Sequence, residues 1–515
     1  MQLGRLLKGM AIDESKGDSD REIEGLAYDS REVKPGYLFV ALRGSTQDGH
    51  DFVKEAIRNG AVAVVLESAG GGKGIDTEVT VVRVPDSRVA LSKLAVEFYG
   101  HPYRDMNLIG ITGTNGKTTT SYLLESILLA AGARPGVIGT INDRLPGKTW
   151  EANVTTPESL ELMQRLRDMA EAGVTHVVME VSSHALDQGR VEDCPFQAAV
   201  FTNISRDHLD YHKSIEAYFE AKSRLFLGLR ERGAGESARA VINMDDPKGR
   251  TLAELTDVPV VTYGQGRNCD FRADRIREGR EGLTARLITP AGEIEIQSRL
   301  IGGFNIYNIL AAAAAALCLD VDPDAVASGV ANLSGVPGRL ELVENARSLS
   351  VVVDYAHTPD ALLKVLEAVK PLVKGRLITV FGCGGDRDKG KRREMGRVAG
   401  EISDLVFITS DNPRTEDPYT IARQIEEGVR ESGLEKLGSD SRDRPEGPGY
   451  FLDLDRGNAI LRAVGMADGN DFVLIAGKGH EDYQITGKGK RHFDDREVAT
   501  EAIRDLGTRN AEFGR

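Results

Sequence analysis

The sequence predicts an α/β fold in which mostly parallel sheets are covered by helices. Short apolar, β-prone runs alternate with helical segments along most of the chain, and this alternation is typical of parallel sheets with helices on both faces. The chain has 515 residues, which is enough for about two to four domains with sizeable cores. We therefore expect several α/β domains rather than one.

Two breaks divide the chain into three predicted domains, 1–105, 106–337 and 338–515. A linker-like segment at 100–105 separates the first two, and the Val336-Pro-Gly338 turn separates the last two. The first domain is a smaller α/β domain in which short apolar runs alternate with glycine-rich breaks. In the other two, strands are expected at 107–112, 175–181, 198–203, 239–243, 350–354, 376–382, 405–410 and 472–476, and an Ala-rich helix at 302–318.

Composition excludes several classes of function. The formal net charge of −14 argues against a nucleic-acid-binding protein, whose binding surface should be basic. No apolar run approaches the ~18–20 residues that span a bilayer, and the first residues carry no secretion signal, so we expect a cytoplasmic protein without a membrane partner. The 4 cysteines lie far apart and form no metal or disulfide pattern. A polar stretch at 437–449 is expected to be a surface loop, with no assigned role.

The stretch Gly113-Thr-Asn-Gly-Lys-Thr118 predicts a site for a nucleotide triphosphate. It joins the strand expected at 107–112 to a helix, and its glycines allow a tight turn whose backbone N–H groups face an anion. Lys117 can reach the β- and γ-phosphates, the Thr118 hydroxyl can bind Mg²⁺, and the helix N-terminus adds its positive dipole end. Because Ile111 stands where the common P-loop has glycine, this is a shortened version of that loop.

Other polar groups follow expected strands, which is where an α/β sheet places its chemistry. Glu180 ends an apolar strand; alone it is as often a solvated acid, but beside a phosphate loop it is a candidate ligand of Mg²⁺. The segment 201–212 concentrates Asp207 and His208 with other charged residues more densely than a polar loop usually does. Lys222 lies on a helical pattern and, taken alone, would be a surface lysine.

Four motifs form a recognisable set when they are taken together. They are Gly113-Thr-Asn-Gly-Lys-Thr118, Glu180-Val-Ser-Ser-His184, Thr202-Asn-Ile-Ser-Arg-Asp-His-Leu-Asp210 and Asp354-Tyr-Ala-His-Thr-Pro359. The set resembles the Mur ligases, ATP-dependent amide ligases that build the stem peptide of bacterial peptidoglycan, and the resemblance runs from about Asp29 to Arg496. It implies an N-terminal domain for a UDP-sugar, a central P-loop-type ATP-binding domain and a C-terminal Rossmann-like domain that binds an amino acid.

The resemblance also implies a reaction in two steps. A substrate carboxylate would attack the γ-phosphate of ATP to give an acyl phosphate, and an amine would then displace phosphate from the acyl carbon. Thr118 and Glu180 would bind one Mg²⁺, and His208 with a carbamylated Lys222 (N6-carboxylysine) would bind another. The implied catalytic residues are Lys117, Glu180, His208 and Lys222. The implied ATP contacts are Gly113, Thr114, Asn115, Gly116, Lys117, Thr118, Thr119, Asn305, Asn308, Arg339, Asp354 and His357.

The segment Asp411-Asn-Pro-Arg414, on its own a turn signal, matches the family motif associated with meso-diaminopimelate. Diaminopimelate is lysine with an additional carboxylate, which the planar guanidinium of Arg414 can bind through two hydrogen bonds. Lysine would leave that guanidinium unpaired, so a discrimination of about 10⁴-fold is expected. The implied diaminopimelate contacts are Arg387, Asp411, Asn412, Pro413, Arg414, Gly477 and Glu481.

Weaker matches point to the site of the UDP-sugar peptide. Without the family, the segments around Tyr28 and Gln47 would be turns, whereas Arg190 is a natural partner for a carboxylate or a diphosphate. The implied contacts are Tyr28, Ser30, Ser45, Thr46, Gln47, Thr155, Thr156, Ser182, Gln188 and Arg190.

Together these matches predict an enzyme that joins meso-diaminopimelate to the D-Glu γ-carboxylate of UDP-N-acetylmuramoyl-L-Ala-D-Glu, using ATP and Mg²⁺, as a monomer. Two alternatives share this chemistry: the lysine-adding ligase of the same step and folylpolyglutamate synthase, which lacks an N-terminal UDP-sugar domain. A nucleotide-binding P-loop NTPase that ligates nothing is an alternative of another class. The combination of Glu180, His208 and Lys222 argues against it.

Overall fold

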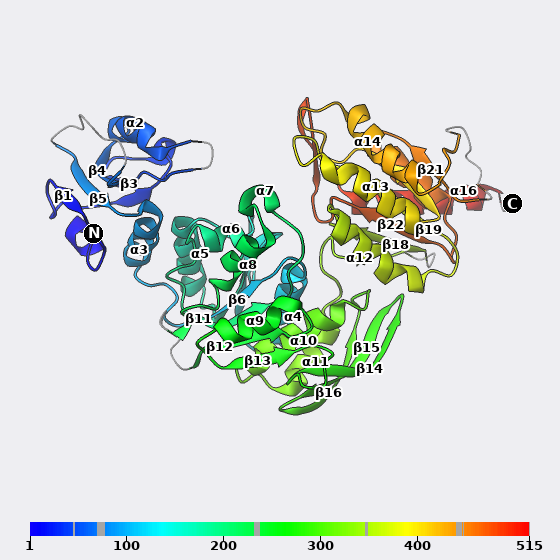
Figure 1. Ribbon diagram of the computed structural model, residues 1–515, viewed down its shortest axis with the longest axis horizontal. Helices are drawn as coiled ribbons and strands as arrows, with labels where there is room; N and C mark the ends of the chain where they lie inside the picture. The colour runs from blue at the N-terminus through cyan, green and yellow to red at the C-terminus, as the bar shows by residue number, and fades with distance from the viewer. Residues whose placement is uncertain are drawn as a thin grey trace. The chain divides into compact units, whose positions relative to one another are not determined.

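The computed structural model describes residues 1–44, 47–69, 78–230, 237–345, 349–438, 445 and 447–513. The chain folds into two compact units, which Figure 1 traces from the N-terminus to the C-terminus. The first unit comprises Met1–Phe271 and Ala311–Val326, and the second unit comprises Arg272–Leu310 and Ala327–Arg515.

A five-stranded sheet opens the first unit. Its strands are β1 (Glu14–Lys16), β2 (Gly25–Ala27), β3 (Tyr37–Val40), β4 (Ala61–Glu67) and β5 (Thr80–Val84), in the order β1-β5-β4-β3-β2. Strands β2 to β5 are parallel, and β1 pairs antiparallel with β5. The accompanying helices are α1 (Leu3–Leu6), α2 (Val53–Arg58) and α3 (Ser87–Tyr99). Asp86 caps α3 by accepting the N–H groups of Arg88 and Val89.

An eight-stranded sheet, in the order β13-β12-β11-β6-β10-β7-β8-β9, forms the centre of the first unit. Its strands are β6 (Asn107–Thr112), β7 (Pro135–Ile138), β8 (Asn142–Leu145), β9 (Lys148–Glu151), β10 (His176–Glu180), β11 (Phe196–Phe201), β12 (Arg239–Asn243) and β13 (Val260–Tyr263). Neighbours from β13 to β7 are parallel, and β8 and β9 add an antiparallel edge. Its helices are α4 (Lys117–Ala130), α5 (Ser159–Glu171), α6 (Ser183–Asp187), α7 (Leu209–His212), α8 (Ile215–Ser223) and α9 (Pro247–Leu255).

Strand β6 lies between β10 and β11. Strands β7 to β10 lie on one side of β6, and the later strands β11 to β13 lie on its other side, so the strand order reverses at β6. Because β6, β10 and β11 are parallel, their carboxyl ends meet at one edge of the sheet. The loop 113–116, the residues after Glu180 and the segment that follows Phe201 therefore converge there. Such a switch point is where open α/β sheets bind ligands.

The second unit holds two larger pieces of sheet. Strands β14 (Arg272–Gly279), β15 (Gly282–Thr289) and β16 (Gly292–Ser298) form an antiparallel sheet. The other sheet, in the order β17-β18-β22-β19-β20-β21, contains β17 (Glu341–Leu342), β18 (Ser350–Asp354), β19 (Leu377–Phe381), β20 (Leu405–Ile408), β21 (Gly449–Leu452) and β22 (Phe472–Ala476). It is parallel except for β17. A hairpin, β23 (Tyr483–Thr486) and β24 (Gly489–His492), follows. Helices α10 (Asn305–Leu317) and α11 (Pro323–Asn332) contribute to both units.

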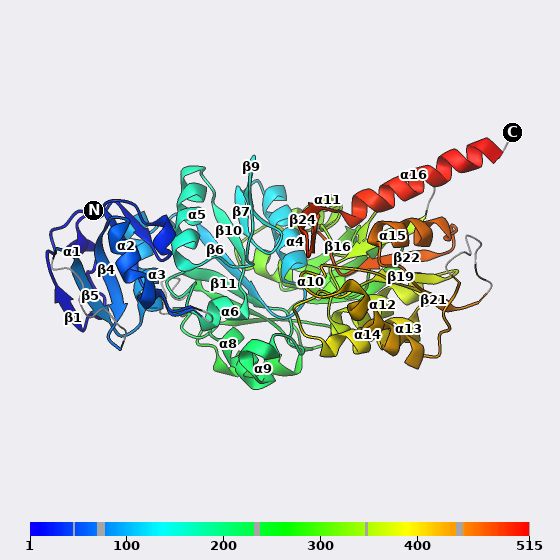
Figure 2. The ribbon, with the colours of Figure 1, turned by 90° about the horizontal axis from the view of Figure 1, so that it is seen from above.

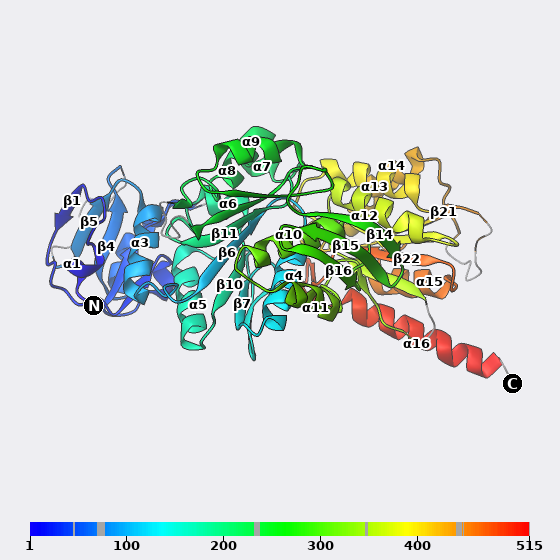
Figure 3. The ribbon, with the colours of Figure 1, turned by 90° about the horizontal axis from the view of Figure 1, so that it is seen from below.

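Helices cover both faces of the six-stranded sheet, as Figures 2 and 3 show. One face packs on α12 (Pro359–Val369), α13 (Gly390–Ile402) and α14 (Pro418–Glu431), and the other on α15 (Arg456–Gly465) and α16 (Asp495–Phe513). Successive strand residues alternate between the two cores: Val352 belongs to the first and Val353 to the second. This is the doubly wound arrangement that the alternation of strands and helices predicts.

The predicted α/β class with mostly parallel sheets is confirmed, and each strand expected beyond residue 106 starts and ends within two residues of its expected bounds. The antiparallel sheet β14–β16 was not predicted. The two boundaries between the three predicted domains stay a prediction, although each predicted domain contains its own mainly parallel sheet. Most of the expected 437–449 loop lies outside the described residues. Among the described helices, none is long and apolar enough to cross a membrane.

Candidate active site

The phosphate loop sits between β6 and α4 in a backbone conformation that needs glycine. Gly113 and Gly116 have φ angles of 147° and 91°, and a Cβ on Gly113 would clash with the Thr202 side chain. The segment after β11 holds the loop in place: Asn203 Oδ1 accepts the Asn115 N–H at 3.0 Å, and the Thr202 hydroxyl donates to Asn115 O at 2.7 Å. The loop is thus preformed, which lowers the entropic cost of binding an anion.

Two lysine side chains meet at this loop. Lys117 Nζ donates to the carbonyl oxygens of Gly113 and Thr114, at 2.8 and 2.9 Å. Lys222 Nζ, on α8, donates to the same Gly113 oxygen at 2.8 Å. Lys222 is only 2% exposed, and its burial, together with the nearby charge of Lys117, moves the pKa of its amine well below the usual value. The structure therefore places Lys222 in the interior beside the phosphate loop, not on the surface.

Three oxygen-bearing side chains cluster behind the loop. Glu180 Oε2 accepts hydrogen bonds from the hydroxyl groups of Thr118 at 2.8 Å and Thr140 at 2.9 Å, and Glu180 is 1% exposed. A side chain on Gly139 would collide with this carboxylate, so the turn after β7 is shaped around it. Thr140 was not predicted from the sequence, where the Gly-Thr pair directly after a strand is its only signal.

This oxygen cluster fits Mg²⁺, which prefers carboxylate and hydroxyl oxygen and takes much of its remaining coordination from water and substrate phosphate. Among the described residues, no group of three or more His, Cys, Asp or Glu side chains could hold a metal by itself. Thr118 and Glu180 are adjacent, as predicted. A cation at this place would need further ligands from a bound nucleotide or water.

His208 packs near Tyr218, whose hydroxyl lies 3.3 Å from the Thr114 hydroxyl of the same loop. Its backbone has φ of 53°, in the left-handed region, which costs energy for a residue with a Cβ. Its ring packs edge-on against His184, at 4.9 Å between centroids. The Tyr218 ring lies near both predicted ligands, with its centroid 6.2 Å from that of His208 and 4.5 Å from Lys222 Nζ. A shared cation site of His208 and Lys222 stays a prediction.

The residues predicted for the sugar-linked peptide also gather beside Glu180. The Thr156 hydroxyl donates to Glu180 O at 2.9 Å, and the Ser182 N–H donates to that hydroxyl at 3.0 Å. Arg190 donates to Thr156 O at 2.8 Å and to Gln188 Oε1 at 2.7 Å. Thr155 reaches the group through the Thr140 hydroxyl, at 3.1 Å.

The other predicted contacts of the UDP-sugar fall between residues 28 and 47, in the part of the chain that forms the five-stranded sheet. Ser30 is buried and donates to Glu55 Oε2 at 3.1 Å, and Gln47 is exposed. Burial and the neighbouring Glu161 raise the pKa of the Tyr28 hydroxyl. Ser45 and Thr46 lie outside the described residues.

Arg88 is an unpredicted cation near Arg190. It donates to Glu158 Oε2 at 2.9 Å, and the same Glu158 oxygen lies 3.4 Å from Arg190.

The remaining predicted ATP contacts belong to the second unit. Asn305 and Asn308 are buried at the start of α10 and hydrogen-bond to each other at 2.8 Å. Asp354 accepts the N–H groups of Leu340 and Ala356, both at 2.7 Å, and burial raises the pKa of its carboxyl. Asp354 thus fixes the turn that carries Arg339. Both Arg339 and His357 pack against the Tyr355 ring.

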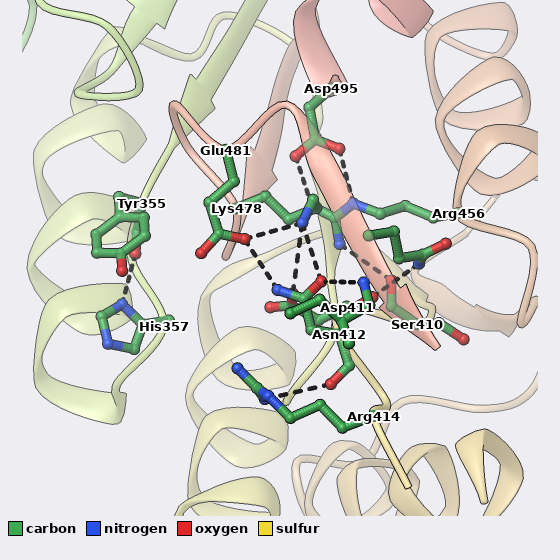
Figure 4. A network of polar contacts seen from close by, with 12 residues as sticks. Tyr355, His357, Ser410, Asp411, Asn412, Arg414, Arg456, Lys478, Glu481 and Asp495 are labelled. Atoms are coloured by element: carbon green, nitrogen blue, oxygen red, sulfur yellow. Dashed lines mark hydrogen bonds and ion pairs between the residues drawn. The ribbon is translucent and has the colours of Figure 1, made fainter. Parts of the chain in front are cut away.

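Most of the predicted diaminopimelate residues follow β20 and β22, and Figure 4 shows Asp411, Asn412, Arg414 and Glu481 among them. Asn412 Nδ2 donates to Glu481 Oε2 at 2.9 Å, and a Cβ on Gly477 would lie 3.0 Å from Asp411 Oδ2. Lys478 is completely buried between the two loops and donates to the same Glu481 oxygen at 2.9 Å. Lys478 was not predicted from the sequence, although it stands between two predicted contacts, Gly477 and Glu481.

Arg414 extends toward the glycine-rich loop after β19. Its guanidinium donates to Gly385 O at 2.8 Å, and a Cβ on Gly384 would contact both Arg414 and Arg387. The two predicted arginines therefore flank one glycine. Arg414 has φ of 54°, so its backbone is held in the left-handed region, the kind of strain that concentrates at functional sites.

Three family models match the chain. The Mur ligase family catalytic domain matches residues 22–99, the Mur ligase middle domain residues 111–316, and the Mur ligase glutamate ligase domain residues 338–479. The chain belongs to the Mur ligase family.

Relatives of known name refine this assignment. The UDP-N-acetylmuramoyl-L-alanyl-D-glutamate–2,6-diaminopimelate ligase of Geobacter metallireducens is 48% identical, over 99% of this chain and 99% of that protein. A solved structure of a ligase with the same name is 32% identical and covers 98% of this chain and 99% of its own, with a TM-score of 0.68. The ADP complex of Mycobacterium tuberculosis folylpolyglutamate synthase is 20% identical, covers 83% of this chain and 94% of its own, and has a TM-score of 0.61, which shows a shared fold alone.

Proposed function

We infer that this chain is an ATP-dependent amide ligase that joins meso-2,6-diaminopimelate to the D-Glu γ-carboxylate of UDP-N-acetylmuramoyl-L-Ala-D-Glu. The observation that carries the choice of amino acid is the cluster of Asn412, Arg414 and Glu481 at the carboxyl ends of two parallel strands. The full-length relative at 48% identity bears the name of this activity. The reaction belongs to peptidoglycan synthesis, and we place it in the cytoplasm.

The first step forms a mixed anhydride. An oxygen of the substrate carboxylate attacks the γ-phosphorus of ATP, the bond to the β,γ-bridging oxygen breaks, and ADP leaves. Lys117, the loop N–H groups and the N-terminus of α4 neutralise the charge on the phosphates. Mg²⁺ held by Thr118 and Glu180 would add further positive charge at the β- and γ-phosphates.

The second step forms the amide. The neutral amine of diaminopimelate attacks the acyl carbon, the carbon–oxygen bond to phosphate breaks, and inorganic phosphate and one proton are released. Arg190 and its neighbours Thr156 and Ser182 hold the peptide end of the acceptor, so the reacting groups meet in a fixed orientation.

Lys222 is suited to carbamylation. A neutral amine attacks CO₂, a nitrogen–carbon bond forms, and one proton is lost to solvent. The low pKa that burial gives Lys222 supplies the neutral amine this requires. The resulting carbamate would offer anionic oxygen donors beside His208, a donor set that suits a hard cation better than an ammonium does.

Arg414 and Glu481 provide opposite charges for the zwitterionic amino acid. The guanidinium of Arg414 would bind the carboxylate that lysine lacks, and Glu481 would accept an ammonium group. Ligation of lysine is the nearest alternative, and it would leave the Arg414 charge without a partner. Folylpolyglutamate synthase is less consistent, because the N-terminal sheet is recognised by a Mur ligase model at residues 22–99.

Phosphate release tests this function. The full-length protein is incubated with ATP, Mg²⁺ and UDP-N-acetylmuramoyl-L-Ala-D-Glu, and meso-diaminopimelate, L-lysine or no amino acid is added in parallel. Release that depends on diaminopimelate supports the assignment. Release that depends on lysine would contradict the role of Arg414, and release without either amino acid would favour a plain NTPase.

A further inference from the structure

An arginine is completely buried at the first position of α15, in the second unit. Arg456 is 0% exposed, and its charge lies at the positive end of the helix dipole. Burial of a charge and its position at a helix N-terminus both cost energy. The cost of burying the Arg456 charge is offset by its ion pair and hydrogen bonds.

The guanidinium of Arg456 makes contacts in three directions (Figure 4). It forms a bidentate ion pair with Asp495, the first residue of α16, with both N···O distances at 2.7 Å. It also donates to Ala476 O at 3.0 Å and to Ser410 O at 3.4 Å. Asp495 is itself 0% exposed and lies at a helix N-terminus, where a negative charge is favourable.

The two carbonyl contacts are informative because of where they lie. Ala476 is the last residue of β22, and Ser410 follows β20. These strands are not neighbours, since β19 lies between them in the sheet. The Arg456 side chain therefore crosses over the end of β19 and joins the stems of two loops that the sheet's own hydrogen bonds connect only through β19.

These two loops, 410–414 and 477–481, carry most of the predicted diaminopimelate contacts. Their tips also touch, through Asn412 and Glu481 at 2.9 Å and through Lys478, which lies 4.0 Å from Asp411 and 3.4 Å from Asn412 Oδ1. Their stems are thus fixed by Arg456 and their tips by the buried lysine.

We propose that the Arg456–Asp495 pair is a positioning device that sets the separation of the 410–414 and 477–481 loops and thereby the affinity for the incoming amino acid. This proposal rests on the proposed function. The printed contacts of Arg456 go to Asp495 and to the carbonyl oxygens of Ser410 and Ala476, so we assign the pair a positioning role that acts through Asn412, Arg414 and Glu481. Without it, the amino-acid site would lose its preorganisation, whereas the phosphate loop of the first unit has separate supports.

The same sheet offers a matched control at its other end. Arg376 precedes β19 and Asp471 precedes β22, and they form an ion pair at 2.8 Å in which Asp471 is buried. This second pair also links two strands, but at the amino ends of the strands, away from both loops. It reports the general cost of breaking a buried pair in this sheet.

The test compares Arg456→Met/Asp495→Leu with Arg376→Met/Asp471→Leu in the full-length protein. Replacing both members of a buried pair by apolar residues is often close to neutral for stability, so both proteins should fold. The first variant should raise the KM for diaminopimelate by about tenfold or more, while the KM values for ATP and the sugar-linked dipeptide change by less than about twofold. The second variant should leave all three values within about twofold.

Amide hydrogen exchange supplies a readout that does not depend on catalysis. Exchange in residues 410–414 and 477–481 should accelerate in the Arg456→Met/Asp495→Leu protein and not in the control. If that variant fails to fold, the single substitution Arg456→Lys, which keeps the charge but cannot reach both carbonyls, should show the same KM shift in weaker form.

Several results would overturn the proposal. Unchanged exchange and an unchanged KM for diaminopimelate in a folded Arg456→Met/Asp495→Leu protein would do so, as would equal effects of the two double variants. A failure of the proposed function is distinguishable, because the unmodified protein would then show no diaminopimelate-dependent phosphate release. In that case the exchange comparison still decides whether the pair fixes the loops.

Discussion

Two buried lysines, one in each unit, lie in opposite electrostatic surroundings. Lys222 has another lysine, Lys117, as its strongest charged neighbour and donates to a backbone carbonyl. Lys478 donates to Glu481 at 2.9 Å and lies 4.0 Å from Asp411, so carboxylates surround it. Burial alone therefore does not decide what a lysine does. Nearby like charge favours a neutral, reactive amine, whereas nearby carboxylates favour a structural cation.

The largest effect on activity is expected from removing the amine of Lys222, which lies beside the phosphate loop. Lys222→Ala should lower kcat by about 10³-fold, because the anionic donor at the second cation position is lost. Activity of the unmodified protein should also fall in CO₂-depleted buffer and recover with bicarbonate. Steady-state phosphate release measures both. Lys248→Ala, on neighbouring α9, serves as the control, and an equal loss in that protein would contradict the account.

We expect the selection of diaminopimelate over lysine to depend on the planar shape of the Arg414 guanidinium as well as on its charge. Arg414→Lys keeps the charge but loses the two parallel hydrogen bonds to the additional carboxylate. We expect kcat/KM for diaminopimelate to fall by about 10²-fold, with little change in the KM for ATP. Parallel assays with both amino acids measure this. Arg397→Lys, on the exposed face of α13, is a matched control, and an unchanged kcat/KM for Arg414→Lys would contradict the selection by Arg414.

We expect Lys222 and Lys478 to differ in their contribution to the free energy of unfolding. Lys478→Met leaves Asp411 and Glu481 without their buried counter-ion and should lower the free energy of unfolding by about 3 kcal/mol. Among the described residues Lys222 forms no ion pair with a carboxylate, so Lys222→Met should leave stability unchanged or slightly higher. Urea denaturation measures both. Equal losses would mean that the neighbouring charges do not distinguish the two positions.

A smaller effect on stability is expected from His480, two residues after Lys478 in the chain. Burial, with the charges of Arg339 and Arg496, lowers the pKa of His480 to about 4. Between pH 6.5 and 4 the unfolded chain binds a proton at this residue that the folded chain does not, so stability is lost as the pH falls. The total loss is at most about 3 kcal/mol.

Denaturation of His480→Gln at several pH values checks this expectation. The difference between the unmodified protein and the variant should grow as the pH falls from 6.5 to 4. A difference that is constant across this range would show that His480 carries a proton equally in both states.

The sequence predicts the parallel sheets well because their strands are continuous apolar runs, as in β18 and β22, which are buried on both faces. Strand β14 was missed because its 8 residues, RADRIREG, include mostly charged side chains, so no apolar run marks it. The loop residues could be predicted from motifs at fixed spacing. Strands β15 and β16 alternate buried and more exposed residues, a period-two signal that a search for continuous apolar runs does not detect.

The parts of the sites that escaped prediction depend on distance in space rather than in sequence. Thr140 reaches Glu180 across 40 positions, and Arg456 reaches Asp495 across 39. Each of these residues alone reads as an ordinary turn or helix residue. Only the sheet order brings them together, and for the same reason the predicted roles of Asn305 and Asn308 remain predictions.

The central claim is that the chain ligates diaminopimelate in preference to lysine. A competition assay tests it most directly: equal concentrations of both amino acids with ATP, Mg²⁺ and UDP-N-acetylmuramoyl-L-Ala-D-Glu, followed by mass spectrometry of the nucleotide products. The account predicts that the diaminopimelate tripeptide dominates by about 10³-fold or more. A lysine tripeptide in comparable amount, or ATP hydrolysis without any tripeptide, would contradict it.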